Sequence, residues 1–326
     1  MSTKDSIGKK YFINNEIFAD AFNYLVYDGQ QIIKAEELRE LDTTEVALPY
    51  GNGARAPVQK YRDVLKLWNA MMDDSAIYVI LGAELQDKVH YGMPVKDGLY
   101  DMIGYSRQID ELRHSYKRKN KDSADSRLVM KDDSLKIKLS GAEFLSGLRK
   151  GDKLIPIVTI VVYLGEKPWD GPKTLHEMLD FKSEEMKAFV PDYKINLISP
   201  ADMNDEEFAK FSTDLGFAMK VIKHQSDCAD EIIGSTDHLI IDRETAVFLN
   251  SVAKLNLEFE ETTGGVDVSV DMCLAMARKE KRDRILGVID YMRDEGKNDA
   301  DIINKITEKF DVTKDYVLAL LESQKV

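Results

Sequence analysis

Two short apolar runs constrain the fold of this chain most strongly. The first, IYVILGAEL, spans Ile77 to Leu85, and the second, IPIVTIVVYLG, spans Ile155 to Gly165. Both are rich in β-branched residues and fall short of the roughly 18 apolar residues that a membrane-spanning helix needs. The sequence therefore predicts two buried strands, with YKINLIS from Tyr193 to Ser199 as a third partner.

Helical spacing of apolar residues predicts helices around these strands. One helix is expected over Asn15 to Tyr27, a second over Val95 to about His114, and a single apolar stripe from Phe208 to Ile222. This order predicts an α/β core of roughly 200 residues in a chain long enough for two domains. We place the first domain at residues 1–225 and an α-helical C-terminal region at residues 226–326.

The last part of the chain predicts three short helices, near Arg282 to Asp294, Asp299 to Phe310 and Thr313 to Glu322. Their spacing resembles a helix-turn-helix, a unit that can read DNA. The last helix, however, has few basic residues. A plain helical bundle or a dimerisation element is the alternative.

Composition limits the class of protein and its setting. The formal net charge is -13 and 32% of the residues are charged, which argues against binding of nucleic acid through bulk positive charge. Cys228 and Cys273 lie far apart and predict no disulfide framework. The polar start, MSTKDSIGKK, has no signal-peptide core. We therefore expect a cytoplasmic protein with no membrane span.

Three polar residues predict a site at the end of the first apolar strand. Residues two apart on a strand face the same side, so Glu84 and Gln86 should project together. Asp63 lies in YRDVLKLW, within a segment (Val58 to Trp68) that fits a strand or a helix. If that segment pairs with the apolar strand through a turn at Asp73-Asp74, Asp63 comes close to Glu84.

Two neighbouring carboxylates repel unless they share a proton or a cation. Hard divalent cations such as Mg²⁺ prefer oxygen ligands and need few from the protein. A bound metal can activate water and stabilise charge on a scissile phosphate. On spacing alone, an acidic residue that is simply solvated at a strand edge remains the alternative.

Several segments in a fixed order resemble a known family. They are NEIFADAFNYLVYDGQQIIKAEELRELDTTE, YRDVLK, YVILGAELQDKVHYGMPVKDGLYDMIGYSRQI, KLIPIVTIVVYLGEKPWDGPKTLHEML and FVPDYKINLISPADM. Over roughly residues 10–225, the chain resembles the recombination-promoting nuclease / putative transposase family of the PD-(D/E)XK nuclease superfamily. The resemblance implies a restriction-endonuclease-like αβββαβ core.

The resemblance also implies roles for the three polar residues. Asp63 and Glu84 correspond to the metal-binding carboxylates, and the backbone carbonyl of Leu85 would be a further metal ligand. Gln86 stands where the superfamily often has lysine. Because glutamine is uncharged at any pH, Gln86 could orient the attacking water but could not stabilise hydroxide by charge.

Two further groups of residues are candidates for this site. Glu16 and Asp20 lie one helical turn apart and could add an acid, or could belong to a solvated helix face. The run HSYKRKNK holds Tyr116, Lys117, Arg118, Lys119 and Lys121. It could contact a phosphate backbone with Tyr116 available for stacking, or it could be a solvated, mobile loop within Arg113 to Lys138.

The sequence and the resemblance together predict a metal-dependent DNA endonuclease that uses Mg²⁺ or Mn²⁺. Asp63 and Glu84 would hold the metal, and Gln86 would orient the water. The implied setting is DNA recombination, mobile elements or phage defence, with DNA as partner and a possible homodimer. The alternative is a transposase-derived DNA-binding or interaction protein without turnover, which the acidic charge and Gln86 both favour.

Overall fold

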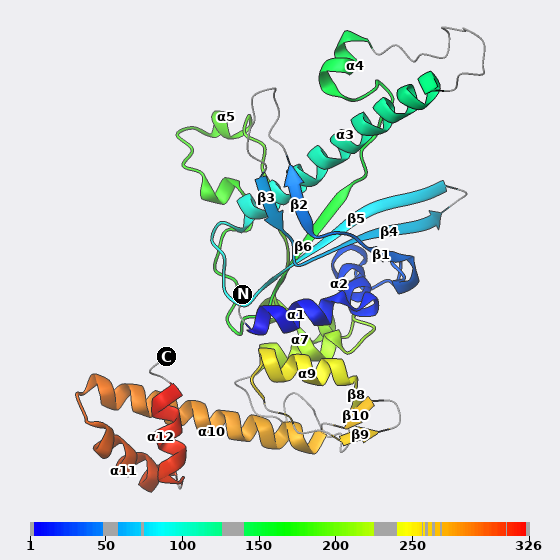
Figure 1. Cartoon of the computed structure of the whole chain (residues 1–326). Coiled ribbons are helices and arrows are strands. Elements are labelled where there is room, and N and C mark those ends of the chain that lie inside the picture. Colours follow the sequence, from blue (N-terminus) through cyan, green and yellow to red (C-terminus); the bar gives the residue numbers. More distant parts are fainter. Residues whose placement is uncertain are drawn as a thin grey trace. The chain divides into compact units, whose positions relative to one another are not determined.

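The computed structural model describes residues 3–47, 58–72, 75–125, 140–224, 240–255, 257, 260–262, 265–267, 269–310 and 312–323. The chain divides into two compact units, Met1–Gly216 and Phe217–Val326 (Figure 1). The domain boundary that we predicted, between residues 225 and 226, lies outside the described residues and stays a prediction.

Two helices open the first unit, α1 over Thr3–Ile13 and α2 over Asn15–Tyr27. The predicted bounds of α2 are confirmed. Its start is fixed by the side chain of Asn14, which accepts a hydrogen bond from the backbone N–H of Glu16. Its end follows from Asp28, whose left-handed conformation (φ 54°) stops the helix.

A five-stranded sheet with the order β1-β4-β5-β6-β7 forms the centre of the first unit. β4 runs antiparallel to both β1 and β5, whereas β5, β6 and β7 run parallel to one another. The strands cover Leu38–Glu40 (β1), Val64–Met72 (β4), Ser75–Gln86 (β5), Ile157–Tyr163 (β6) and Asn196–Ile198 (β7). All three predicted strands are therefore confirmed.

The segment that fitted either a strand or a helix is extended. It contains the whole of β3 (Val58–Tyr61) and the start of β4. β3 pairs antiparallel with β2 (Thr44–Ala47) in a separate two-stranded sheet. Met72 pairs with Ser75 across the expected β4–β5 hairpin, whose turn residues Asp73 and Asp74 lie outside the described residues.

The two faces of β5 carry different residues because successive side chains alternate across a strand. Ala83 and Leu85 are buried on one face, where a Cβ placed on Gly8 of α1 would lie 3.4 Å from Leu85. Glu84 meets helix α3 (Met93–Asp125) on the other face. Helices thus cover both faces of the sheet, with α1 and α2 on one side and α3 on the other (Figure 1).

A buried lysine fixes the α1–α2 pair on the sheet. The ammonium of Lys66 on β4 donates to the backbone carbonyl of Ile13 at 2.5 Å and to the side chain of Asn15. The carbonyl belongs to the last residue of α1, where the helix dipole is negative. Burial lowers the pKa of Lys66 to about 8, an effect that the charge of Glu40 partly offsets.

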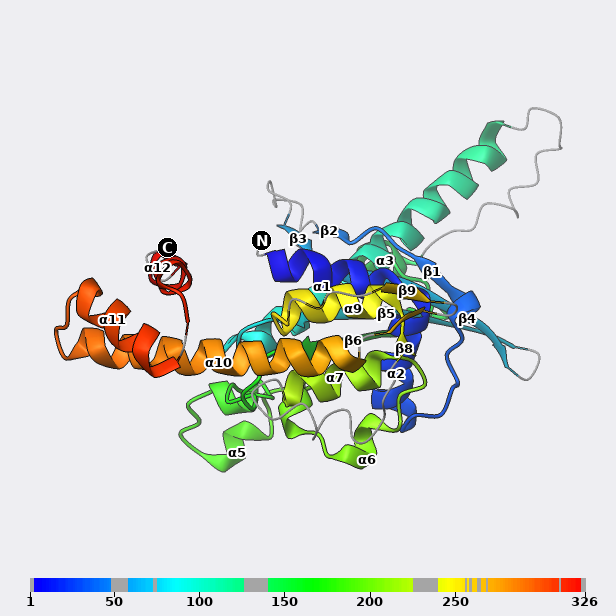
Figure 2. The same ribbon diagram turned by 90° about the horizontal axis from the view of Figure 1, so that it is seen from below.

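Helix α3 corrects one prediction. It spans 33 residues and continues to Asp125, whereas we expected its end near His114 and a mobile loop after it. Figures 1 and 2 show the later half of α3 projecting beyond the sheet. Charged residues separated by three or four positions, such as Arg107 and Glu111 at 2.9 Å, are compatible with an exposed helix.

Short elements complete the first unit. They are η1 (Ala35–Glu37), α4 (Gly141–Ser146), η3 (His176–Met178), α5 (Glu184–Lys187), η4 (Pro200–Asp202) and α6 (Asp205–Phe208). The single stripe expected from Phe208 to Ile222 is two helices, α6 and α7 (Leu215–Lys223). The chain leaves the helix between them because Ser212 and Thr213 donate their backbone N–H groups to Asp20.

The second unit is not purely helical, which corrects another prediction. It holds a small sheet of order β8-β10-β9, from Ile240–Ile241 (β8), Glu260–Thr262 (β9) and Gly265–Asp267 (β10). Helix α9 (Arg243–Val252) follows β8. The final helices are α10 (Ser269–Asp294), α11 (Asp299–Phe310) and α12 (Lys314–Ser323). The first of these begins 13 residues before its predicted start.

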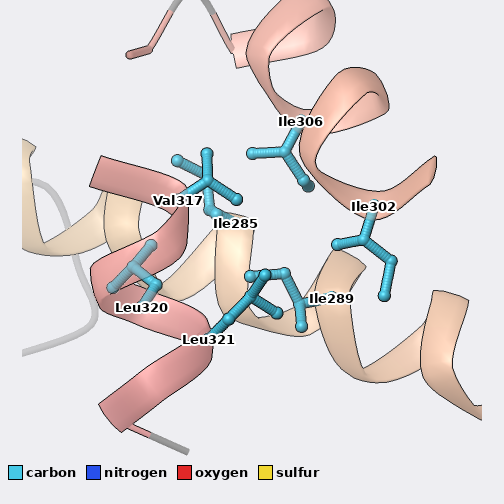
Figure 3. Packing of buried hydrophobic residues seen from close by; sticks show 7 residues of the cluster. All are labelled: Ile285, Ile289, Ile302, Ile306, Val317, Leu320 and Leu321. Carbon is cyan, nitrogen blue, oxygen red and sulfur yellow. The ribbon is translucent and has the colours of Figure 1, made fainter. Parts of the chain in front are cut away.

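The last three helices enclose a core of their own. Seven buried aliphatic residues meet between them: Ile285, Ile289, Ile302, Ile306, Val317, Leu320 and Leu321 (Figure 3). The buried residues of α12 therefore face α10 and α11 and form part of a helical bundle. This packing supports the helical-bundle alternative. It does not test whether these three helices bind DNA or form a dimer interface.

The predicted α/β class is confirmed by a mixed fold with a five-stranded sheet. Within the described part of the chain, no helix combines the length and the apolar character that a membrane span requires.

Candidate active site

The hairpin brings Asp63 to the strand that carries Glu84. Asp63 lies between β3 and β4, directly before Val64, which pairs with Ala83 of β5. Its Oδ2 accepts a hydrogen bond from the backbone N–H of Leu85 at 2.9 Å. The predicted proximity of the two acidic residues is therefore confirmed, and their role as metal ligands remains open.

Glu84 is a buried carboxylate with only 1% of its surface exposed. Its Oε2 lies 2.7 Å from the ammonium of Lys96 on α3, and its Oε1 has no hydrogen-bond partner among the described residues. Burial raises the pKa of Glu84 to about 7; Lys96 opposes this shift and the charge of Asp63 adds to it. Glu84 is thus an anion that needs a cation to stay ionised near neutral pH.

Gln86 and Leu85 are in contact with each other. The side-chain Nε2 of Gln86 donates to the backbone carbonyl of Leu85 at 2.9 Å, which is the carbonyl expected to bind a metal. Gln86 is half-buried at the end of β5 and pairs in register with Tyr163 of β6. It follows Glu84 by two positions on the strand, as the predicted shared face requires.

A second acid of α3 was not predicted. Asp97 is 1% exposed, and its Oδ1 has no hydrogen-bond partner in the described structure. Burial raises its pKa to about 8, with further contributions from the charges of Glu84 and Asp101. The sequence places Asp97 and Asp101 four residues apart, on one face of a helix, but it does not indicate that this face meets Glu84.

A buried ion pair lies behind these groups. The guanidinium of Arg62 donates to Oδ1 of Asp101 at 2.8 Å and also to the hydroxyl of Thr159 on β6. Thr159 donates in turn to Asp101 at 2.7 Å, and Tyr193 donates to the other oxygen of Asp101. Because every charge of this network is paired, we regard it as the structural support of the site.

Comparison with protein families gives one match. Residues 143–245 match the family model described as "Putative transposase, YhgA-like". This segment is similar to that family of putative transposases. The transposase part of the resemblance is therefore confirmed, whereas membership of the PD-(D/E)XK superfamily stays a prediction. No curated protein matches the chain, and neither does any solved structure.

The YhgA-like segment supports the site without containing its carboxylates. It includes β6, whose Val161 and Tyr163 pair with Glu84 and Gln86. Asp63 and Glu84 precede the matched residues, so the family match does not test their roles.

The two acidic residues of α2 that were candidates for the site have different surroundings. Asp20 is 1% exposed and accepts four hydrogen bonds from the backbone N–H and hydroxyl groups of Ser212 and Thr213, at 2.6 to 2.9 Å. These donors lie in the YhgA-like segment and use both oxygens of Asp20. Glu16 is exposed on α2. The structure therefore gives Asp20 a role in holding the chain after α6.

The predicted nucleic-acid-binding run lies on α3. The hydroxyl of Tyr116 donates to Asp152 at 2.6 Å, and the guanidinium carbon of Arg149 lies 3.9 Å from the ring centroid. The hydroxyl and one ring face of Tyr116 are thus engaged within the protein. Lys117, Arg118, Lys119 and Lys121 belong to the helix, and their side chains lie outside what is described.

No group of three or more His, Cys, Asp or Glu side chains in the described residues is arranged to hold a metal ion. Any metal at this site would therefore rest on two carboxylates and on backbone or water oxygens. Mg²⁺ is suited to such a set, because it keeps several waters and takes one or two carboxylates.

Proposed function

We propose that this chain is a Mg²⁺- or Mn²⁺-dependent DNA endonuclease that hydrolyses a phosphodiester bond. Asp63 and Glu84 would hold the metal, with the carbonyl of Leu85 as a further ligand. One observation carries the proposal. Glu84 is a buried carboxylate close to Asp63, and the Oε1 of Glu84 has no hydrogen-bond partner among the described residues. An unpartnered buried oxygen is costly unless something else binds it.

The donor set fits a hard divalent cation. All the candidate ligand atoms are oxygens, which Mg²⁺ prefers. The charge of Asp63 raises the pKa of Glu84, and a shared cation would remove that cost. The Leu85 carbonyl would serve as a ligand if the Gln86 amide turned away from it.

The residues of the chain would divide the work of hydrolysis. A bound metal would supply a water of lowered pKa and would neutralise charge on the phosphate. The backbone N–H of Leu85 holds Asp63 in place. The amide of Gln86, which can both donate and accept hydrogen bonds, would orient the attacking water but would add no charge. The oxygen of that water would bond to phosphorus while one ester P–O bond breaks.

One feature supports DNA as the substrate, and a second supports the αβββαβ nuclease core. The YhgA-like segment is similar to a family of putative transposases, and transposition acts on DNA. The order α2, β1, β4, β5, α3, β6, with β2 and β3 inserted after β1, agrees with the αβββαβ order that the resemblance implies. DNA recombination, mobile elements or phage defence remains the proposed setting, and a homodimer remains a possibility to be measured.

One observation favours a second candidate function, a DNA-binding protein without turnover. Lys96 already neutralises Glu84, and Gln86 already contacts the Leu85 carbonyl. A site whose groups satisfy one another could be stable without a metal. The net charge of -13 also limits binding of DNA to a local surface.

A nicking assay separates the two functions. Supercoiled plasmid would be incubated with purified protein in Mg²⁺, Mn²⁺, Ca²⁺ or EDTA, beside Asp63→Ala, Glu84→Gln and the control Glu36→Gln, at an exposed acid of η1. We expect nicking in Mg²⁺ or Mn²⁺ by the wild type and by the control. Neither site variant should nick.

Two results would count against the nuclease. Site variants that nick as fast as the wild type would show that the cleavage comes from a contaminant or another site. A wild type that binds DNA and never nicks in any metal would support the non-catalytic protein. Size-exclusion chromatography with light scattering on the same samples would give the oligomeric state.

A further inference from the structure

A lysine of α3 stands at the candidate site in a position that its sequence neighbours did not indicate. The Nζ of Lys96 lies 2.7 Å from Oε2 of Glu84. The Lys96 side chain is 26% exposed, whereas the side chain of Glu84 is 1% exposed. Lys96 is therefore a partly exposed side chain whose ammonium binds a buried anion.

The lysine is held by its surroundings as well as by Glu84. It lies in the first turn of α3, which begins at Met93 and packs on the Glu84 face of the sheet. The ring of Tyr100, one turn later, has its centroid 5.7 Å from Nζ. An anion on one side and an aromatic face on the other restrict where the ammonium can point.

The other cation near Glu84 cannot perform the same task. The side chain of Arg62 is fully buried, and its guanidinium is paired with Asp101 at 2.8 Å. It lies behind the site and has no exposed surface to offer a substrate. Gln86, at the strand end, is uncharged. Among the described residues, Lys96 is thus the partly exposed cation that contacts Glu84.

The two oxygens of Glu84 have different environments. Oε2 is bound by Lys96, whereas Oε1 has no partner in the described structure. A metal could therefore bind at Oε1 while the ammonium stays at Oε2. Lys96 would then not compete with the metal for Glu84. Its ammonium would lie beside the metal, close to the phosphate oxygens on which negative charge develops during hydrolysis.

We propose that Lys96 is a further catalytic residue, whose ammonium contacts the scissile phosphate and supplies the charge that Gln86 lacks. This inference rests on the proposed nuclease function. Lys96 keeps its proton throughout. The oxygen of water forms the new bond to phosphorus, and an ester P–O bond breaks. The proton of the water passes to solvent, and solvent protonates the departing oxygen. The ammonium stabilises the extra charge on the phosphate oxygens.

The test compares Lys96→Met and Lys96→Arg with Lys153→Met, an exposed lysine before the opposite end of β6. Plasmid nicking is measured with enzyme in excess over DNA. Binding of Mn²⁺ without DNA is measured by isothermal titration calorimetry, and thermal unfolding is recorded for each variant. The Mn²⁺ titration reports on the carboxylates independently of turnover.

We expect Lys96→Met to slow nicking by about 10²–10³-fold, as for loss of one charge-stabilising donor. Mn²⁺ should bind this variant at least as tightly as the wild type, because a positive charge beside Glu84 is gone. Lys96→Arg should recover part of the rate, and Lys153→Met should match the wild type in every measurement.

Three results would overturn the inference, and they differ from one another. If Lys96→Met nicks plasmid as fast as the wild type, Lys96 is not a catalytic residue, while the nuclease proposal itself stands. Joint loss of Mn²⁺ binding and thermal stability, without rescue by arginine, makes Lys96 a structural residue. Absence of both nicking and Mn²⁺ binding in the wild type overturns the nuclease proposal together with this one.

Discussion

Oδ2 of Asp63 accepts a hydrogen bond from the backbone N–H of Leu85 at 2.9 Å. This hydrogen bond holds the Asp63 carboxylate next to β5, at the residue that follows Glu84. The contact depends on the β4–β5 register, in which Val64 faces Ala83. A shift of that register by one residue would turn Glu84 to the opposite face of the sheet.

Replacing Asp63 by asparagine tests whether its charge matters beyond this hydrogen bond. Asp63→Asn keeps an acceptor oxygen for Leu85 but removes an anionic ligand. We expect metal affinity and nicking to fall by at least about 10–100-fold, the range seen when groups that support a metal ligand are lost. Calorimetric Mn²⁺ titration and plasmid nicking would measure this, and an unchanged Mn²⁺ affinity would exclude Asp63 from the metal site.

Replacing Asp20 should damage stability and leave the chemistry intact. Asp20→Ala leaves the donors of Ser212 and Thr213 without their charged acceptor. We expect the free energy of unfolding to fall by about 2–4 kcal/mol, as measured by urea denaturation. Glu16→Ala, on the exposed face of the same helix, should change it by less than about 0.5 kcal/mol. If the Asp20→Ala protein folds but no longer binds Mn²⁺, Asp20 takes part in metal binding and the prediction is wrong.

The basic run at the end of α3 can be tested through salt dependence. Simultaneous replacement of Lys117, Arg118, Lys119 and Lys121 by alanine should weaken DNA binding. Each lost phosphate contact should also reduce the slope of log affinity against log salt by about 0.9 for duplex DNA. Fluorescence anisotropy at several salt concentrations would give the slope. An unchanged slope would place the DNA contact elsewhere.

The sequence could predict the parts of the site that depend on local pattern. Alternation along β5 placed Glu84 and Gln86 on one face, and hairpin pairing brought Asp63 beside them. Both are properties of neighbouring strands joined by a short turn. The bounds of α2 followed in the same way from its cap and its apolar spacing.

Other parts depend on contacts between distant segments. Lys96 and Asp97 reach Glu84 only because α3 packs on that face of the sheet. Asp20 is bound by residues nearly two hundred positions later. Periodicity along one segment carries no information about such partners, so Asp20 was named as a candidate for the site and Lys96 was missed.

The burial of Asp97 predicts how stability depends on pH. Burial, together with Glu84 and Asp101, raises its pKa from 3.8 to about 8, although Arg62 and Lys96 oppose the shift. Below about pH 4 the carboxyl group is protonated in both the folded and the unfolded chain. As the pH rises further the unfolded chain releases this proton first, so the folded state loses stability until the pH passes about 8.

Asparagine mimics the protonated acid, so Asp97→Asn should remove this contribution. The wild type without metal, in EDTA, should lose up to about 1.4 kcal/mol of unfolding free energy per pH unit from this group. The variant should lose less between pH 5 and pH 8, with the remaining dependence due partly to Glu84, whose pKa is also raised. Urea denaturation at both pH values would measure the difference. Identical pH dependence in the two proteins would mean that Asp97 is already ionised in the folded state, with a cation close enough to keep it so.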